Sequence, residues 1–237
     1  MMLRSLPYDF QIRKIAIVDD DRREAEVAEL EVEDAGFEPF IVEGGPFQRV
    51  EDLTDLISLN AQAAICDHRL AHSGFANFTG ARLVAHLYDL YIPAVLISQY
   101  ADMDNGISIR ACRDKIPVLL SRDETDATSI ARGIEYCVNE LRGQVANTRK
   151  PHRTLLRIVD LGREAGEKVI DVIIPSWNPH RAVRLPAMLL PKSISRSHLK
   201  RGERLFAKIN IGAEKASELY FKDFEVAMEP DDDDGLA

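Results

Sequence analysis

Residues 14–21 read Lys14-Ile-Ala-Ile-Val-Asp-Asp-Asp21, an apolar run that begins near Ile12 and ends in three aspartates. Continuous apolar runs of this length are typical of strands that are buried on both faces of a parallel sheet. From Arg22 to Ala35 the apolar residues recur every three or four positions, and Gly36 follows. That spacing predicts an amphipathic helix that stops at the glycine.

The same alternation of apolar runs and helical spacing continues to about residue 142. We expect further strands at 37–42, 63–67, 92–98 and 116–120, and further helices at 50–60, 81–90, 107–113 and 125–141. Five strands alternating with five helices predict an α/β fold with a doubly wound, five-stranded parallel sheet. In such a sheet, ligands bind at the carboxyl ends of the strands.

Polar residues stand at those carboxyl ends. They are Asp19, Asp20 and Asp21 after the first strand, Asp67 at the end of the third, Ser98 at the end of the fourth and Arg122 after the fifth. Any one of them could be a helix cap or a loop residue, but together they place a carboxylate cluster, a hydroxyl and a cation at one rim. Clustered carboxylates are typical ligands of Mg²⁺. An aspartate beside such a metal can attack a phosphoryl group, and the hydroxyl and the cation would stabilise the transferred charge.

With the paired acids, the strand-end aspartate, the serine and the cation in this order along the chain, residues 12–142 resemble the receiver domain of two-component response regulators. That domain has a flavodoxin-like fold. The resemblance implies a phosphorelay protein that takes a phosphoryl group on Asp67 from a histidine kinase or a phosphotransfer protein. It implies that Mg²⁺ is held by Asp19, Asp20 and the backbone carbonyl of Arg69, and that Ser98 is the switch hydroxyl. Such a chain is no conventional enzyme, because it catalyses phosphoryl transfer only to its own aspartate.

Two side chains depart from the family pattern. Arg122 stands where the family has a lysine, and a planar guanidinium cannot replace an ammonium group without repositioning. Leu119 stands at the usual aromatic switch position, for which Tyr100 is the nearest aromatic. These departures leave a second hypothesis open: a degenerate, receiver-like scaffold that binds protein or nucleic acid without being phosphorylated.

The loop that follows Asp67 is a third departure. At 68–79 it is longer than the family's short turn, and it carries His68 and His72, which we expect to be ordinary polar loop residues. A further alternative is a phosphatase of the haloacid dehalogenase type, in which Asp19-x-Asp21 would be the first motif. We disfavour it because a charged helix begins at once, at Arg22, where that family has a flexible turn.

From Thr154 the pattern changes to short strand-like runs separated by glycine and proline. We expect strands at 155–159, 169–174, 183–190, 205–211 and 219–226. Short strands with few helical stretches predict a small all-β barrel or sandwich. The predicted organisation is a receiver-like domain at 1–145, a small β output or partner-binding domain at 153–229, and an acidic disordered tail at 230–237.

The charge changes sign between the two halves. Residues 1–149 carry 15 Lys and Arg against 25 Asp and Glu, whereas residues 150–229 carry 15 against 10. Seven basic residues lie within 177–204, against the single acid Glu203: Arg181, Arg184, Lys192, Arg196, Lys200, Arg201 and Arg204. We expect this basic 177–204 face to dock a protein partner or an acidic part of the same chain. Nucleic-acid binding, with Trp177 as an exposed aromatic, is the less favoured alternative.

The composition is that of a globular protein: 237 residues, 46% hydrophobic and 29% charged. No apolar run approaches the roughly 20 residues that cross a bilayer, so we expect no membrane partner. The first residues lack the pattern of a signal peptide. Cys66, Cys112 and Cys137 are too widely spaced for a disulfide framework or a CxxC metal site. We therefore expect a reducing, cytoplasmic compartment.

Overall fold

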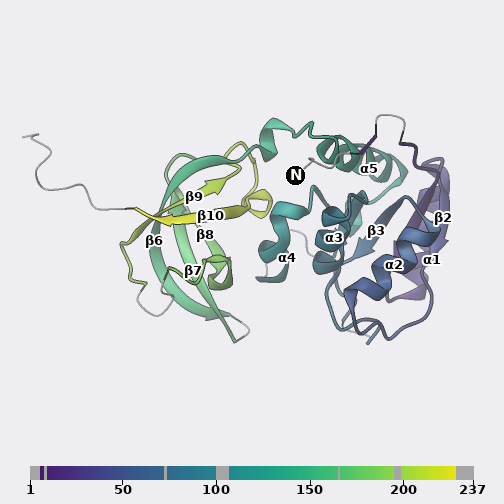
Figure 1. The fold of residues 1–237 in the computed structure, drawn as a ribbon, viewed down its shortest axis with the longest axis horizontal. Helices are drawn as coiled ribbons and strands as arrows, with labels where there is room; N and C mark the ends of the chain where they lie inside the picture. The colour runs from purple at the N-terminus through teal and green to yellow at the C-terminus, as the bar shows by residue number, and fades with distance from the viewer. Residues whose placement is uncertain are drawn as a thin grey trace, which may run out of the picture. The chain divides into compact units, whose positions relative to one another are not determined.

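The computed structural model describes residues 6–7, 10–71, 74–99, 107–164, 166–194 and 199–227. The chain divides into two compact units, Met1–Asn147 and Thr148–Ala237, and Figure 1 shows that the first is α/β and the second is built of strands. Several residues named above lie outside the described residues: His72, Tyr100, Arg196 and the acidic tail at 230–237.

The first unit contains a parallel sheet of five strands. They are β1 (Lys14–Val18), β2 (Glu38–Ile41), β3 (Ala63–Asp67), β4 (Ala94–Ser98) and β5 (Val118–Ser121). Their order is β2-β1-β3-β4-β5, and every neighbouring pair is parallel. This is the flavodoxin-like order, so the predicted doubly wound sheet is confirmed.

Helices cover both faces of this sheet. They are α1 (Arg22–Asp34), α2 (Val50–Asn60), α3 (Gly80–Asp89), α4 (Ile107–Cys112) and α5 (Ala127–Leu141). Alternate residues of β1 point to opposite faces. Ala16 and Val18 pack with residues of α2 and α3, whereas Ile15 and Ile17 pack with residues of α1 and α5. Because both faces are covered, β1, β3 and β4 are almost wholly buried, as their continuous apolar runs predict.

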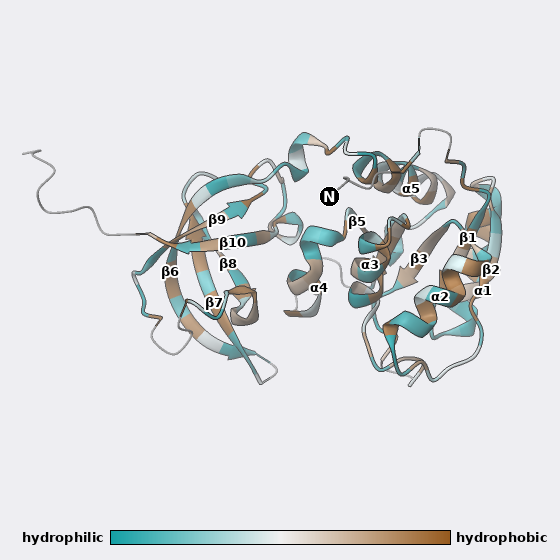
Figure 2. Cartoon of the chain, viewed as in Figure 1, coloured by the Kyte–Doolittle hydropathy of each residue, from teal (hydrophilic) through white to brown (hydrophobic). Residues whose placement is uncertain are grey.

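The second unit is an antiparallel sheet, which confirms the all-β prediction. Its strands are β6 (His152–Glu164), β7 (Glu167–Ile174), β8 (Asn178–Pro186), β9 (Arg204–Ile209) and β10 (Phe221–Val226). They form a single row in the order β10-β9-β6-β7-β8. Figure 2 shows hydrophilic and hydrophobic residues interleaved along these strands, as expected for a sheet that buries one face.

One strand of this unit is displaced from its predicted position. The run 183–190 was expected to be a strand, but β8 ends at Pro186 and residues 187–189 form a short 3-10 helix. The ladder with β7 ends where Val169 pairs with Pro186. Ala187 and Leu190 are nevertheless buried in the core. An apolar run in the sequence therefore indicates burial, but it does not distinguish a strand from a turn.

The helices that the structure describes include none of the length and apolar character that a membrane span requires.

Candidate metal centre

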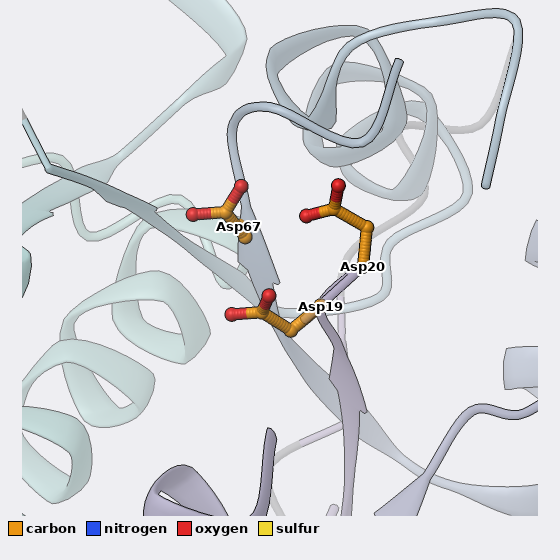
Figure 3. Close-up of side chains that lie close together, drawn as sticks. All are labelled: Asp19, Asp20 and Asp67. Carbon is orange, nitrogen blue, oxygen red and sulfur yellow. The ribbon is translucent and has the colours of Figure 1, made fainter. Parts of the chain in front are cut away.

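Three carboxylates meet where the strand order reverses. The chain leaves β1 for β2 on one side and returns to β3 on the other, and crevices at such switch points are the usual ligand sites of this sheet type. Asp19 and Asp20 directly follow β1, and Asp67 ends β3 (Figure 3). One carboxylate oxygen from each of the three lies within 4.8 Å of the others. The structure therefore brings together the three acids that the sequence singles out.

The cluster is largely shielded from solvent, which makes its charge costly. The side chains of Asp19 and Asp67 are 7% and 9% exposed. Burial raises the pKa of Asp19 to about 6; the Asp21 amide and Arg122 oppose this rise, and the nearby charge of Asp67 adds to it. Crowded oxygen ligands of this kind suit a hard divalent cation, so the donor set fits Mg²⁺.

Arg122 partly neutralises the cluster. It begins a short 3-10 helix directly after β5. Its Nη2 donates to Asp67 Oδ1 and, at 2.9 Å, to Asp19 Oδ2, while its Nη1 donates to Glu24 Oε2 at 2.9 Å. Burial disfavours the charged guanidinium, but the pairs with Asp19 and Asp67 outweigh it and raise the pKa of Arg122. The arginine is therefore fixed as a cation against two of the three acids.

The other predicted site residues lie at the same rim. The backbone amide of Arg69 donates to Asp67 Oδ2 at 2.5 Å, which places Arg69 beside the cluster and holds the Asp67 carboxylate. Ser98 ends β4 and is 1% exposed. It follows Ile97, which is the register partner of Asp67. Asp21 is the N-cap of α1, accepting a hydrogen bond from the Arg23 amide.

Glu24 is a site residue that the sequence analysis missed. It lies in the first turn of α1, where an acid is common because it interacts favourably with the helix dipole. Its pairing with Arg122, 98 positions away, has no local signal in the sequence.

Gly80, the first residue of α3, is a second missed position. A Cβ atom there would lie 1.9 Å from the Asp67 carbonyl oxygen. Only a residue without a side chain allows the start of α3 to approach the strand end that carries the central aspartate.

The long loop after Asp67 is anchored to the unit. Phe47 and Ala76 form a bridge, and the rings of Phe47 and Phe75 have centroids 5.3 Å apart. His68 lies in this loop as expected, but it is only 7% exposed, and its Nε2 lies 3.1 Å from Ser108 Oγ in α4. A histidine directly after a buried strand end is carried into the interior with it.

The basic 177–204 face differs from the expectation in two places. Trp177 is half-buried against the core of the second unit, and its indole N–H donates to the Ala213 carbonyl at 2.7 Å. It is therefore not an exposed aromatic. Arg184 is paired with Asp171 at 2.8 Å and with Glu164 at 2.9 Å, so its charge is compensated.

Comparison with known proteins gives matches of structure only. No family model matches the chain, and no curated protein matches its sequence. The first half of the chain matches response regulator receiver domains in structure. A receiver domain from Clostridium thermocellum is 14% identical, with a TM-score of 0.42, over 54% of this chain and 95% of that one.

Two further structures give the same picture. A putative response regulator from Chloroflexus aurantiacus is 20% identical, with a TM-score of 0.40, over 56% of this chain and 99% of that one. A CheY-like receiver domain from Methylobacillus flagellatus is also 20% identical, with a TM-score of 0.40, over 54% and 99%. We assign the fold from the observed strand order. We infer the chemistry of the site from the side chains of this chain.

Proposed function

We propose that the chain is a response regulator of a phosphorelay. Its first unit accepts a phosphoryl group on Asp67 from a histidine kinase or a phosphotransfer protein. The observation that supports this function most strongly is the position of three carboxylates, those of Asp19, Asp20 and Asp67, within 4.8 Å of one another at the switch point of a flavodoxin-like sheet.

The roles of the residues follow from their contacts. Asp19, Asp20 and the carbonyl of Arg69 would hold Mg²⁺, which supplies positive charge beside the incoming phosphoryl oxygens. The Arg69 amide already holds Asp67 Oδ2, which orients the carboxylate so that its other oxygen, Oδ1, is the nucleophile. Arg122 now donates to Oδ1, and it would exchange that contact for the phosphoryl oxygens.

The transfer itself is a displacement at phosphorus. Asp67 Oδ1 forms the new P–O bond while the P–N bond to the donor histidine breaks. The imidazole nitrogen keeps the electron pair of that bond and takes a proton from solvent. Ser98 and Arg122 would donate hydrogen bonds to the transferred oxygens, which stabilises their charge.

Signalling then requires a partner that distinguishes two conformations. Contacts of Ser98 and Arg122 with a phosphoryl group would favour one arrangement of the β4 and β5 ends over another. A ligand or a partner shifts such an equilibrium only by its differential affinity for the two states. In our proposal the second unit is the output or partner-binding module.

A scaffold without phosphorylation is the second candidate. The contacts of Arg122 with Asp19, Asp67 and Glu24 favour it, because they partly neutralise the cluster with a side chain of the chain itself. In that case the unit would keep its fold and bind partners through its surface, and no metal would be needed.

The test is incorporation of label from acetyl [³²P]phosphate, with Mg²⁺ or with EDTA. We expect the wild-type chain to be labelled only with Mg²⁺ and Asp67→Asn to stay unlabelled. Asp34→Asn is the matched control, because Asp34 is an exposed acid at the end of α1, outside the cluster, and it should label normally. Absence of label in the wild-type chain, together with a flat Mg²⁺ titration, would favour the scaffold.

A further inference from the structure

The second unit carries a second basic surface, which shares only Arg204 with the 177–204 face. It is the side of the sheet opposite the core, and we call it the basic sheet face. Along β6 the buried residues are Thr154, Leu156 and Ile158, and the residues between them are exposed. The basic sheet face is formed by five residues of β6, β9 and β10: Arg153, Arg157, Arg204, Lys208 and Lys222.

Strand register arranges these cations in two rows. In one row Lys222 pairs with Lys208, and Lys208 pairs with Arg153. In the other, Arg157 lies directly opposite Arg204. Like charges directly opposite one another destabilise a sheet, and burial of the opposite face does not require them. An anionic ligand would supply the counter-charge that the opposed pair Arg157 and Arg204 lacks among the described residues.

Acidic side chains compensate only part of this charge. Glu225 pairs with Arg153 at 2.9 Å, and Asp223 pairs with Lys208 at 2.8 Å. Among the residues that the structure describes, no carboxylate lies within ion-pair distance of Arg157, Arg204 or Lys222. The face therefore carries three cations that have no ion-pair partner among the described residues.

An aromatic and apolar strip separates the two rows. Phe206 lies directly opposite Leu155, which is 36% exposed. The guanidinium of Arg153 lies over the Phe206 ring, 3.7 Å from its centroid, so its outer plane is a second flat surface. Arg153 and Arg157 are four residues apart on one strand, which separates the rows by about 13 Å.

A hollow adjoins this strip. It has a volume of about 300 Å³, and its lining includes Arg153, Leu155, Pro175 and Ser176. Its lining combines the apolar residues Leu155, Pro175 and Ile211 with the cation Arg153. A flat ring bearing a nearby negative charge fits this chemistry better than a carboxylate on a flexible side chain does.

We propose that the basic sheet face binds single-stranded nucleic acid. The phosphates would pair with the cations of the two rows, and a base would stack on Arg153 over Phe206 or enter the hollow beside Leu155. Charged rows that follow a backbone, combined with stacking surfaces, are how sheets bind single strands. A duplex keeps its base faces covered and would use only the cations. This site does not depend on phosphoryl transfer to Asp67.

The test measures binding of fluorescein-labelled oligothymidylate and oligouridylate to the full chain by anisotropy over a range of salt concentrations. The decisive variant is Arg157→Gln/Arg204→Gln, which removes the two opposed cations that have no ion-pair partner within the described ranges. The matched control is Arg181→Gln/Arg201→Gln, two exposed cations of the 177–204 face. We expect the first pair to weaken binding at least tenfold and the control to change it less than about twofold.

The salt dependence and a stacking variant separate charge from stacking. Loss of two phosphate contacts should lower the magnitude of the slope of log K against log[salt] by about 1.4. Phe206→Ala should weaken binding by roughly fivefold or more with an unchanged slope, because it removes stacking and no charge. Circular dichroism checks that each variant is folded. If the double variant unfolds, the proposal is tested by the binding of Arg204→Gln alone and by the salt slope of the wild-type chain.

Three results would overturn the proposal. The first is absence of binding by the wild-type chain at low salt, and the second is an equal loss in the control pair. The third is displacement of both oligonucleotides by poly-glutamate at equal charge concentration, with no effect of Phe206→Ala. That last outcome would identify an acidic protein as the partner.

Discussion

Arg122 contacts the oxygens that a metal ion would also approach. Its Nη2 donates to Asp19 and Asp67, and its charge repels a second cation. We therefore predict that Arg122→Gln binds Mg²⁺ more tightly than the wild-type chain does, by on the order of tenfold, because lost repulsion outweighs any lost positioning. Without Mg²⁺ the variant should melt at a lower temperature, since three close carboxylates are left uncompensated. Calorimetric titration and thermal melts measure the two effects.

Arg122→Lys is the conservative control for this prediction. A lysine keeps the charge but cannot bridge Asp19, Asp67 and Glu24 with one planar group. Its Mg²⁺ affinity should stay within a few-fold of the wild-type value. Weaker Mg²⁺ binding by Arg122→Gln than by the wild-type chain would contradict the competition that we describe.

The site residues differ in how far the sequence could reveal them. Asp19, Asp20 and Asp67 were predictable, because each ends an apolar run and parallel strands bring such ends to one rim. Glu24 was not, since its partner Arg122 is 98 positions away and an acid in a first helical turn is common. The burial of His68 was not predicted, because a loop position in the sequence says nothing of burial.

The start of α3 is an element-scale constraint on the site. Gly80 lies against the Asp67 carbonyl, and its amide donates to the His68 carbonyl at 3.0 Å. We predict that Gly80→Ala lowers the free energy of unfolding by at least about 2 kcal/mol, because the new methyl group collides with backbone. Mg²⁺ affinity should fall as well, since relief of the collision displaces Asp67. Denaturant unfolding and calorimetry test the prediction.

Gly162→Ala is the matched control for Gly80→Ala. A Cβ atom at Gly162 would make an ordinary contact of 3.6 Å with Val169 Cγ2. This variant should be neutral or slightly stabilised, because alanine loses less chain entropy than glycine. Equal stability of the two variants would contradict the close approach of α3 and β3.

The N-terminus of α5 gives a pH-dependent prediction. The Asp126 carboxylate accepts a hydrogen bond from the Ser129 amide in a capping box, and that bond holds the pKa of Asp126 below its usual range. A lowered folded-state pKa contributes stability that is present above the unfolded-state pKa and is lost as the pH falls through the folded-state value. Asp126→Ala should therefore lower the melting temperature by a few degrees at neutral pH.

The difference in melting temperature between Asp126→Ala and the wild-type chain should shrink as the pH falls below the usual range of an aspartate. Asp34→Ala is the control, because Asp34 lies at the end of α1 and caps nothing; it should cause no loss at either pH. A difference that stays constant down to strongly acid pH would show that the carboxylate charge contributes nothing.

The positions of helices and strands in the first unit were predictable because the local apolar patterns agree with the burial that the sheet imposes. The apolar runs that form β1, β3 and β4 are buried on both faces, and a helical pattern follows each of the first three strands. In the second unit, the predicted position of β8 was displaced because the 3-10 turn at 187–189, of which Ala187 is buried, is as apolar as a strand. Pairing order could not be read there, since β6 pairs with β9 across a long connection.

At the scale of the whole molecule, two units with separate chemistry share one chain. The described core clusters each draw their residues from one unit. The carboxylate cluster belongs to the first, and the basic sheet face belongs to the second. In our proposal the first unit receives a phosphoryl group, and the second unit is the output or partner-binding module.

The most direct test of the central claim is the chemical identity of the residue that carries the phosphoryl group. The full chain would be treated with acetyl phosphate and Mg²⁺, reduced with borohydride, digested, and sequenced by mass spectrometry. Borohydride converts an aspartyl phosphate to homoserine, so we predict homoserine at position 67 and unchanged aspartate at positions 19 and 20. Homoserine at another position, or unmodified aspartate at 67 under conditions that label a known receiver domain, would contradict the proposed function.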